Sequence, residues 1–148
     1  YRIYCKKNLK HSIKYKENIN LKEINKFVLK VKNNKKKFIS FVKKAQKEKK
    51  KIFLYGASTK GNTLLQYYNV NSKIIPYAAE RSPEKWGKYT VGSGVKIITE
   101  NEARKLNPDY FFVMPYAFIN EFKKRESKWL NKGGKFILPY PNFQIVKR

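Results

Sequence analysis

A glycine-containing loop at residues 56–62 carries the groups best suited to bind an anion. It follows Ile-Phe-Leu-Tyr, an apolar run typical of a buried β-strand, and it begins with Gly56, which tolerates a tight turn. Ser58 or Thr59 can cap a helix that starts near Lys60. Unpaired N–H groups at a helix start favour an anion, and Lys60 adds a positive charge. An ordinary strand-to-helix turn without a ligand is the alternative.

A second candidate, Glu80, directly follows the expected strand Lys73–Ala79. In dinucleotide-binding folds an acidic residue at the end of the second strand binds ribose hydroxyls. The glycines here do not follow the Gly-x-Gly-x-x-Gly spacing of those folds, and no Walker loop is present. We expect Glu80 to accept a hydrogen bond from a ribose or sugar hydroxyl; an ion pair with Arg81 or a nearby lysine is the alternative.

Tyr116 follows the expected strand Asp109–Met114, at the edge where α/β sheets hold ligands, and could stack on or bond to one. Residues 81–94 form a long loop that either serves a site or is held as plain structure by Trp86. The residues expected to bind substrate or phosphate are Gly56, Ala57, Ser58, Thr59, Lys60, Gly61, Asn62, Glu80, Arg81 and Tyr116. No catalytic residue is named, because no paired carboxylates accompany the loop.

Alternating helices and strands must position these residues. The expected strands cover 52–55, 73–79, 95–98, 109–114 and 135–138, and the expected helices cover 21–49, 60–69, 99–106 and 119–130. This order predicts an α/β fold: a small Rossmann-like, mostly parallel five-stranded sheet with helices on both faces, preceded by a long N-terminal amphipathic helix.

The long helix has one apolar face opposite a lysine-rich face. The apolar face comprises Leu21, Ile24, Phe27, Val28, Val31, Phe38, Phe41, Val42 and Ala45. This one-sided pattern favours a helix packed on its own domain over a nucleic-acid arm or a membrane-surface helix. Between Lys32 and Lys37 the apolar spacing slackens, so a bend or break is expected there.

Composition narrows the function classes. The net charge of +25 suggests a polyanion partner, yet only five of the 35 basic residues are arginines, and lysines of this kind are mostly solvated surface. One cysteine and one histidine exclude an internal disulfide and a clustered metal site. No apolar run is long enough to span a membrane, and no signal peptide is visible, so a cytoplasmic setting is expected.

The first 20 residues are expected to lie outside the Rossmann-like domain of residues 21–148. Tyr1–Lys7 alternates like one strand, and the polar stretch Asn8–Asn20 is typical of a linker that also holds His11. Because the strand has no partner nearby and the chain opens on Tyr1, we expect a fragment of a longer protein.

Several segments resemble one family, the C-terminal domain of S-adenosylmethionine-dependent sugar C-methyltransferases, which act on nucleotide-linked deoxysugars. The matching segments are residues 55–65 (Tyr-Gly-Ala-Ser-Thr-Lys-Gly-Asn-Thr-Leu-Leu), 80–89 (Glu-Arg-Ser-Pro-Glu-Lys-Trp-Gly-Lys-Tyr), 92–97, 107–110 and 133–141. Three positions depart from the family pattern: Tyr116-Ala117 stands where Trp and then His or Asn are usual, Lys96 replaces a proline, and Glu80 is often Asp.

The resemblance implies a division of labour between domains. S-adenosylmethionine and the acid and base groups would belong to a missing central domain, where a base removes a proton next to a sugar ketone and the enolate attacks the methyl group. Tyr1–Cys5 would be the end strand of that domain, and a zinc segment is expected further upstream. The partners would be a nucleotide-diphosphate sugar and the central domain, without membrane or nucleic acid, and this fragment alone would be inactive.

Two alternatives stay open. A basic nucleic-acid-binding module would use the lysines of residues 1–51 and lose affinity steeply with salt. A small nucleotide- or dinucleotide-binding Rossmann domain would use the same loop, although the glycine spacing argues against it.

Overall fold

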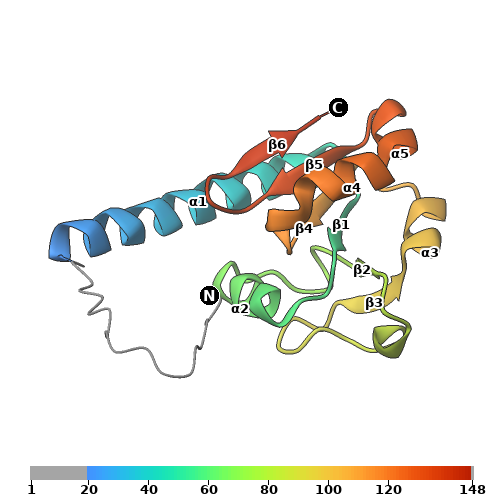
Figure 1. Cartoon of the computed structure of the whole chain (residues 1–148), viewed down its shortest axis with the longest axis horizontal. Coiled ribbons are helices and arrows are strands. Elements are labelled where there is room, and N and C mark those ends of the chain that lie inside the picture. Colours follow the sequence, from blue (N-terminus) through green and yellow to red (C-terminus); the bar gives the residue numbers. More distant parts are fainter. Residues whose placement is uncertain (1–19, 148) are drawn as a thin grey trace, which may run out of the picture.

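The computed structural model describes residues 20–147, in which six short strands form one sheet (Figure 1). The strands are β1 (Ile52–Tyr55), β2 (Tyr77–Glu80), β3 (Lys96–Thr99), β4 (Tyr110–Val113), β5 (Lys135–Leu138) and β6 (Gln144–Val146). Their spatial order is β3-β2-β1-β4-β5-β6, and every pair is parallel except β5 with β6. The predicted Rossmann-like α/β fold is confirmed.

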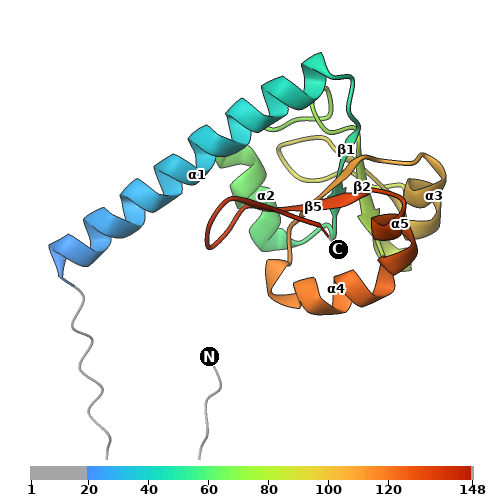
Figure 2. The ribbon, with the colours of Figure 1, turned by 90° about the horizontal axis from the view of Figure 1, so that it is seen from above.

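Helices cover both faces of the sheet, as expected. Helices α1 (Leu21–Lys47) and α2 (Thr59–Tyr67) pack on one face, and α3 (Glu100–Lys105), α4 (Ile119–Arg125) and α5 (Ser127–Asn131) pack on the other. Figure 2 shows α1 and α2 on one side of β1, with α3 and α5 on the opposite side. Because both faces are covered, the central strands β1 and β4 are buried along their whole length, which explains their continuous apolar sequences.

Three elements differ from the expectation. A sixth strand, β6, pairs along the edge of β5, but its three residues are mostly exposed and carry no apolar alternation that would reveal it. Strand β2 starts only at Tyr77, because the N–H groups of Ile74 and Ile75 bond to the carbonyl of Asn71 in a turn. The expected helix 119–130 is split at Glu126, a buried residue that ends α4 and precedes α5.

Helix α1 is continuous, so the expected bend or break between Lys32 and Lys37 does not occur. Asn34 explains the slackened apolar spacing, because it is buried and faces the domain in place of an apolar residue. Its Nδ2 donates to the carbonyl of Pro141, and its Oδ1 accepts from the N–H of Phe143. The side chain therefore ties α1 to the segment between β5 and β6.

Only the second half of α1 packs on its own domain. Phe38, Val42 and Ala45 are buried against the sheet, whereas Leu21, Ile24, Phe27 and Val28 are exposed. Figures 1 and 2 show the N-terminal half extending beyond the other elements. The expectation that the whole apolar face covers the domain is therefore wrong for this half.

The expected end strand and linker lie in residues 1–20, of which the structure describes only Asn20, and the domain division stays a prediction. Asn20 caps α1 by accepting a hydrogen bond from the N–H of Glu23. Among the described helices, none combines the length and apolar character needed to cross a membrane.

We predict that Asn34→Ala lowers the free energy of unfolding by about 2 kcal/mol, because two hydrogen bonds are lost and two partly buried backbone groups lose their partner. Urea denaturation measures the change. Asn33→Ala is the matched control, since Asn33 is exposed on the same helix, and it should change stability by less than about 0.5 kcal/mol. Equal stability of the two variants would contradict the assigned role of Asn34.

Candidate functional site

A cavity of about 330 Å³ opens at the carboxyl ends of β1 and β2, on the face that carries α3 and α4. Its wall contains the loop after β1, the end of β2, the first residue of α3 and one side of α4. This is the edge of a parallel sheet where α/β proteins place their ligands, and the volume lies at the small end of the range for ligand pockets.

Two glycines fix the loop after β1 against the end of β4. Gly56 has φ +83°, and a Cβ there would lie 2.8 Å from Cδ of Pro115. A Cβ on Gly61 would lie 2.5 Å from Cε of Met114, so this glycine lets α2 approach β4 closely. Gly61 thus contributes by close packing, which is the part played by the third glycine of dinucleotide-binding loops.

The carboxylate of Glu80 holds the same loop from the side of β2. Its Oε2 accepts the N–H of Ala57 at 2.7 Å and lies 3.4 Å from Nζ of Lys85, while its Oε1 accepts the N–H groups of Arg81 and Ser82. Burial alone would raise the pKa of Glu80, but these N–H groups and the charge of Lys85 outweigh it, so the pKa lies below its usual value. Four donors match the four lone-pair sites of a carboxylate.

The start of α2 leaves backbone donors available for an anion. Ser58 caps the helix by accepting the N–H of Gly61. The N–H groups of Thr59 and Lys60 come too early in the helix to have an intrahelical partner, and within residues 20–147 the N–H of Ser58 has none either. The side chain of Lys60 is exposed beside them.

The long loop after β2 brings a further cation to this place. It contains a short 3₁₀ helix, Pro83–Lys85, and is anchored where Nε1 of Trp86 donates to the carbonyl of Glu80 at 2.9 Å. Nζ of Lys85 then donates to the carbonyl of Ala57 at 3.0 Å. Lys85 therefore joins this loop to the loop after β1 and lines the cavity.

The residues expected to bind substrate are only partly brought together. Those that line the cavity are Gly56, Ala57, Ser58, Glu80 and Arg81. Thr59 and Lys60 lie on the adjacent exposed turn, while Gly61 is buried and Asn62 is half-buried in α2. Tyr116 lies outside the cavity wall in a 3₁₀ helix, Tyr116–Phe118, with its ring 5.3 Å from that of Tyr140. Their roles in binding stay predictions.

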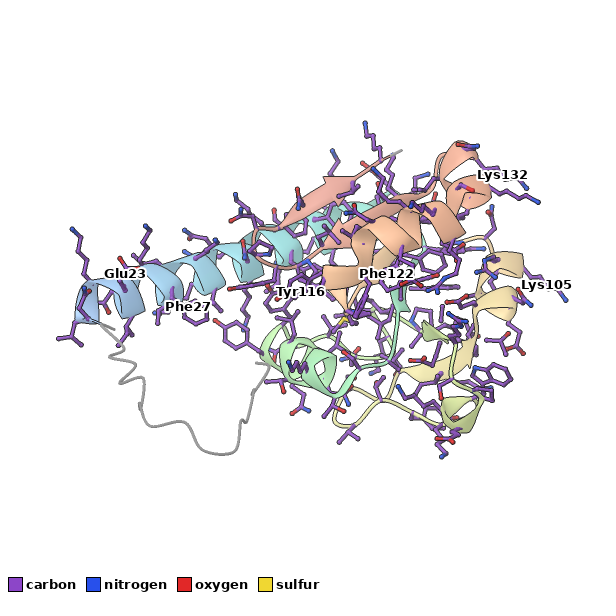
Figure 3. All side chains as sticks on the ribbon, in the orientation of Figure 1. Glu23, Phe27, Lys105, Tyr116, Phe122 and Lys132 are labelled. Carbon is purple, nitrogen blue, oxygen red and sulfur yellow. The ribbon has the colours of Figure 1, made fainter. Side chains whose placement is uncertain are left out.

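Arg125 and two acidic residues, Glu100 and Glu121, line the side of the cavity opposite the loop. Arg125 donates to the hydroxyl of Tyr55 at 3.0 Å and pairs with Glu100 and Glu121, both at 3.1 Å. Figure 3 shows the labelled Phe122, which also lines the cavity, on the α4 side of the sheet. Behind it, the buried Glu126 accepts the hydroxyl of Tyr55 at 2.7 Å and two hydrogen bonds from Arg104.

The contacts in this network raise the pKa values of Tyr55 and Arg104. Burial, followed by the hydrogen bond to Glu126, raises the pKa of Tyr55, so its hydroxyl stays protonated and donates to the carboxylate. The hydrogen bond to Glu126 is also the main cause that raises the pKa of Arg104 above its usual value. Glu126 and Arg104 thus form a paired set of charges behind the cavity wall.

Sequence reasoning did not single out Lys85, Arg125 or Glu126. Two of these residues could have been found from the sequence. Lys85 lies inside the distinctive segment 80–89. Arg125 follows Glu121 by four residues, which is the usual spacing of an ion pair on a helix. The pairing of Arg104 with Glu126 joins α3 to the end of α4 and could not be found without the fold.

Comparison with known proteins gives two findings. A model of the family described as C-methyltransferase C-terminal domain matches residues 5–141. The C-methyltransferase NovU of Streptomyces niveus is 30% identical over 92 residues, which make up 62% of this chain and 22% of that protein. The chain therefore matches about a fifth of the length of this relative.

We predict that Glu80→Gln lowers stability at pH 7 by about 2 kcal/mol, since hydrogen bonds to a charged acceptor are lost. Because the folded-state pKa of Glu80 is lowered, its contribution is fully present above the usual carboxyl pKa of about 4.3 and is lost as the pH falls through the folded value. The gap to the unsubstituted protein should therefore narrow below about pH 4. Thermal unfolding between pH 3 and 7 measures it.

The matched control for that experiment is Glu84→Gln. Glu84 is an exposed residue of the loop that follows β2. It should leave the stability unchanged across the same pH range. A gap for Glu80→Gln that stays constant with pH would show that the ionised carboxylate does not hold the loop.

We predict that Glu126→Gln costs about 3 kcal/mol, because an amide turns an N–H₂ group toward Arg104 and leaves the arginine without its buried counter-charge. The value lies at the low end for a broken buried pair, since the Arg104 side chain is 32% exposed. Glu121→Gln, whose carboxylate is mostly exposed, should cost less than about 1 kcal/mol. Urea unfolding of both variants compares them, and equal costs would refute the structural role of Glu126.

Proposed function

Since this chain belongs to the family of C-methyltransferase C-terminal domains, we propose that it is the nucleotide-sugar-facing domain of an S-adenosylmethionine-dependent C-methyltransferase. The observation that carries the proposal is the cavity lined by Arg81 and Lys85, next to the start of α2 with its open backbone N–H groups and the exposed Lys60. Donors of this kind recognise a diphosphate rather than an apolar ligand.

The proposed diphosphate lies against the N–H groups of Ser58, Thr59 and Lys60. The N–H of Ala57 takes no part, because it is bonded to Glu80. The side chains of Lys60 and Lys85 supply positive charge on the two sides of this turn. Three carboxylates also line the cavity: Glu80 pairs with Lys85, and Glu100 and Glu121 pair with Arg125. Lys60 and Arg81 therefore add the positive charge that balances the ligand.

Glu80 acts on the ligand chiefly by holding the loop. It can accept a sugar hydroxyl as well only if Lys85 gives up its place at Oε2, and their separation of 3.4 Å is the longest of the four contacts to this carboxylate. The deoxysugar extends from the diphosphate into the cavity between the loop and α4. A volume of about 330 Å³ suits one end of a nucleotide sugar, so the rest would face another part of the enzyme.

We place S-adenosylmethionine outside this domain. The acidic residue that would hold its ribose in a Rossmann-like fold is Glu80, and the described donors around Glu80 already use its lone-pair sites. A ribose hydroxyl of the cofactor would have to displace Lys85 from Oε2, and we assign no step of methyl transfer to these residues. The domain by itself would bind the sugar nucleotide without catalysing the reaction.

Titration with thymidine diphosphate, followed by amide shifts in an ¹⁵N spectrum, tests the binding site. We expect the largest shifts at Ser58, Thr59 and Lys60 at millimolar ligand. Lys85→Ala should weaken binding about tenfold through the loss of a charged contact to phosphate. Lys73→Ala, which removes an exposed lysine outside the cavity wall, serves as control and should leave the Kd unchanged.

The absence of shifts between Gly56 and Asn62 at millimolar ligand would rule out the proposed diphosphate site. A parallel titration with S-adenosylmethionine separates the two ligands. Shifts around the same loop with this compound, and none with the diphosphate, would assign the site to the cofactor instead.

A further inference from the structure

The first eleven residues of α1, Leu21–Val31, which we call the arm, carry large apolar side chains that nothing in residues 20–147 covers. Leu21 is 77% exposed, Ile24 44%, Phe27 54% and Val28 39%. Figure 3 shows the labelled Glu23 and Phe27 on the part of the helix that extends away from the sheet. At 1.5 Å per residue the arm is about 15 Å long, enough for a specific contact.

The exposed apolar face continues a face that is already an interface. Leu21, Ile24, Val28 and Val31 alternate at spacings of three and four residues, and the same register leads to Phe38, Val42 and Ala45, which are buried on the sheet. One continuous stripe is thus covered by the domain in its second half and is bare in its first half.

The charges around the stripe indicate what covers it. On a helical projection Lys32 and Glu23 flank the arm's apolar face, whereas Lys22, Lys26 and Lys30 lie on the other side of the helix. A second copy of this chain would bring lysines near lysines and would add another net charge of +25. An apolar groove on a partner that carries less positive charge is the better match.

The geometry also disfavours a flat membrane surface. The packed half of the stripe lies against the sheet domain, so the bare half faces the same side as the body of the domain. A flat bilayer approaching the arm's apolar face would meet the domain first. A rounded protein surface can fill the corner between the arm and the domain.

We propose that the arm's apolar face is the docking surface for the methyltransferase part of the same polypeptide, which meets it through an apolar groove. This inference rests on the proposed function, in which this domain works beside a catalytic part. It agrees with the comparison, because the aligned segment makes up only 22% of the related C-methyltransferase.

Hydrogen exchange tests the proposal on the full polypeptide and on the present chain. We expect the amides of Leu21–Val31 to exchange at least tenfold more slowly in the full polypeptide. The double variant Ile24→Gln/Val28→Gln should return them to the rates of the present chain. Leu29→Gln is the matched control: Leu29 is 60% exposed but lies on the opposite side of the helix, so protection should persist.

Other occupants give different results. Equal exchange rates in the two proteins would overturn the proposal. So would protection that appears in the present chain with rising concentration, which indicates a second copy, or only with vesicles of anionic phospholipid, which indicates a membrane.

The same variants separate this inference from the proposed function. Ile24→Gln/Val28→Gln should keep the thymidine diphosphate shifts at Ser58–Lys60, since the arm does not line the cavity. If the unsubstituted full polypeptide binds the nucleotide but does not protect the amides of the arm, only the docking surface is refuted. Protection of the arm without nucleotide binding refutes only the ligand site.

Discussion

The strand order reverses between β1 and β4, and the geometry of the site depends on this reversal. The helix after β1 returns along one face of the sheet toward β2, and the helix after β4 runs along the other face toward β5. The segments that follow β1 and β4 therefore diverge at the carboxyl edge of the sheet. Gly56 and Pro115, the first residues of the two loops after these strands, lie close together at this point. Any bulkier residue at position 56 would push these two strand ends apart.

Two carboxylates stabilise the walls on either side of this opening, and each does so by a different means. Glu80 binds mainly backbone N–H groups and so determines the path of the loop between β1 and α2. Glu126 binds side chains, Tyr55 and Arg104, and so joins α3, β1 and the break between α4 and α5. Both walls of the opening are thus held by contacts within the protein.

The fold was more predictable from the sequence than the site. Central strands and helix starts depend on local patterns: the strand Ile52–Tyr55 appears as expected, and the expected helix 99–106 begins with a Thr99–Glu102 capping box. The site depends on partners distant in sequence: Ala57 with Glu80, and Arg104 with Glu126. Glu80 was found because its position after a strand is informative, but its four donors could be identified only from the folded chain.

Helix α1 shows why periodicity alone cannot say what a helix face contacts. Its apolar register is the same at Leu21–Val31 and at Phe38–Ala45, yet only the second part meets the sheet, because the helix is longer than the surface available to it. An apolar sequence pattern predicts a buried helix face but does not identify the domain that covers it. The bare half of the stripe is therefore apolar surface that the described part of the chain leaves uncovered.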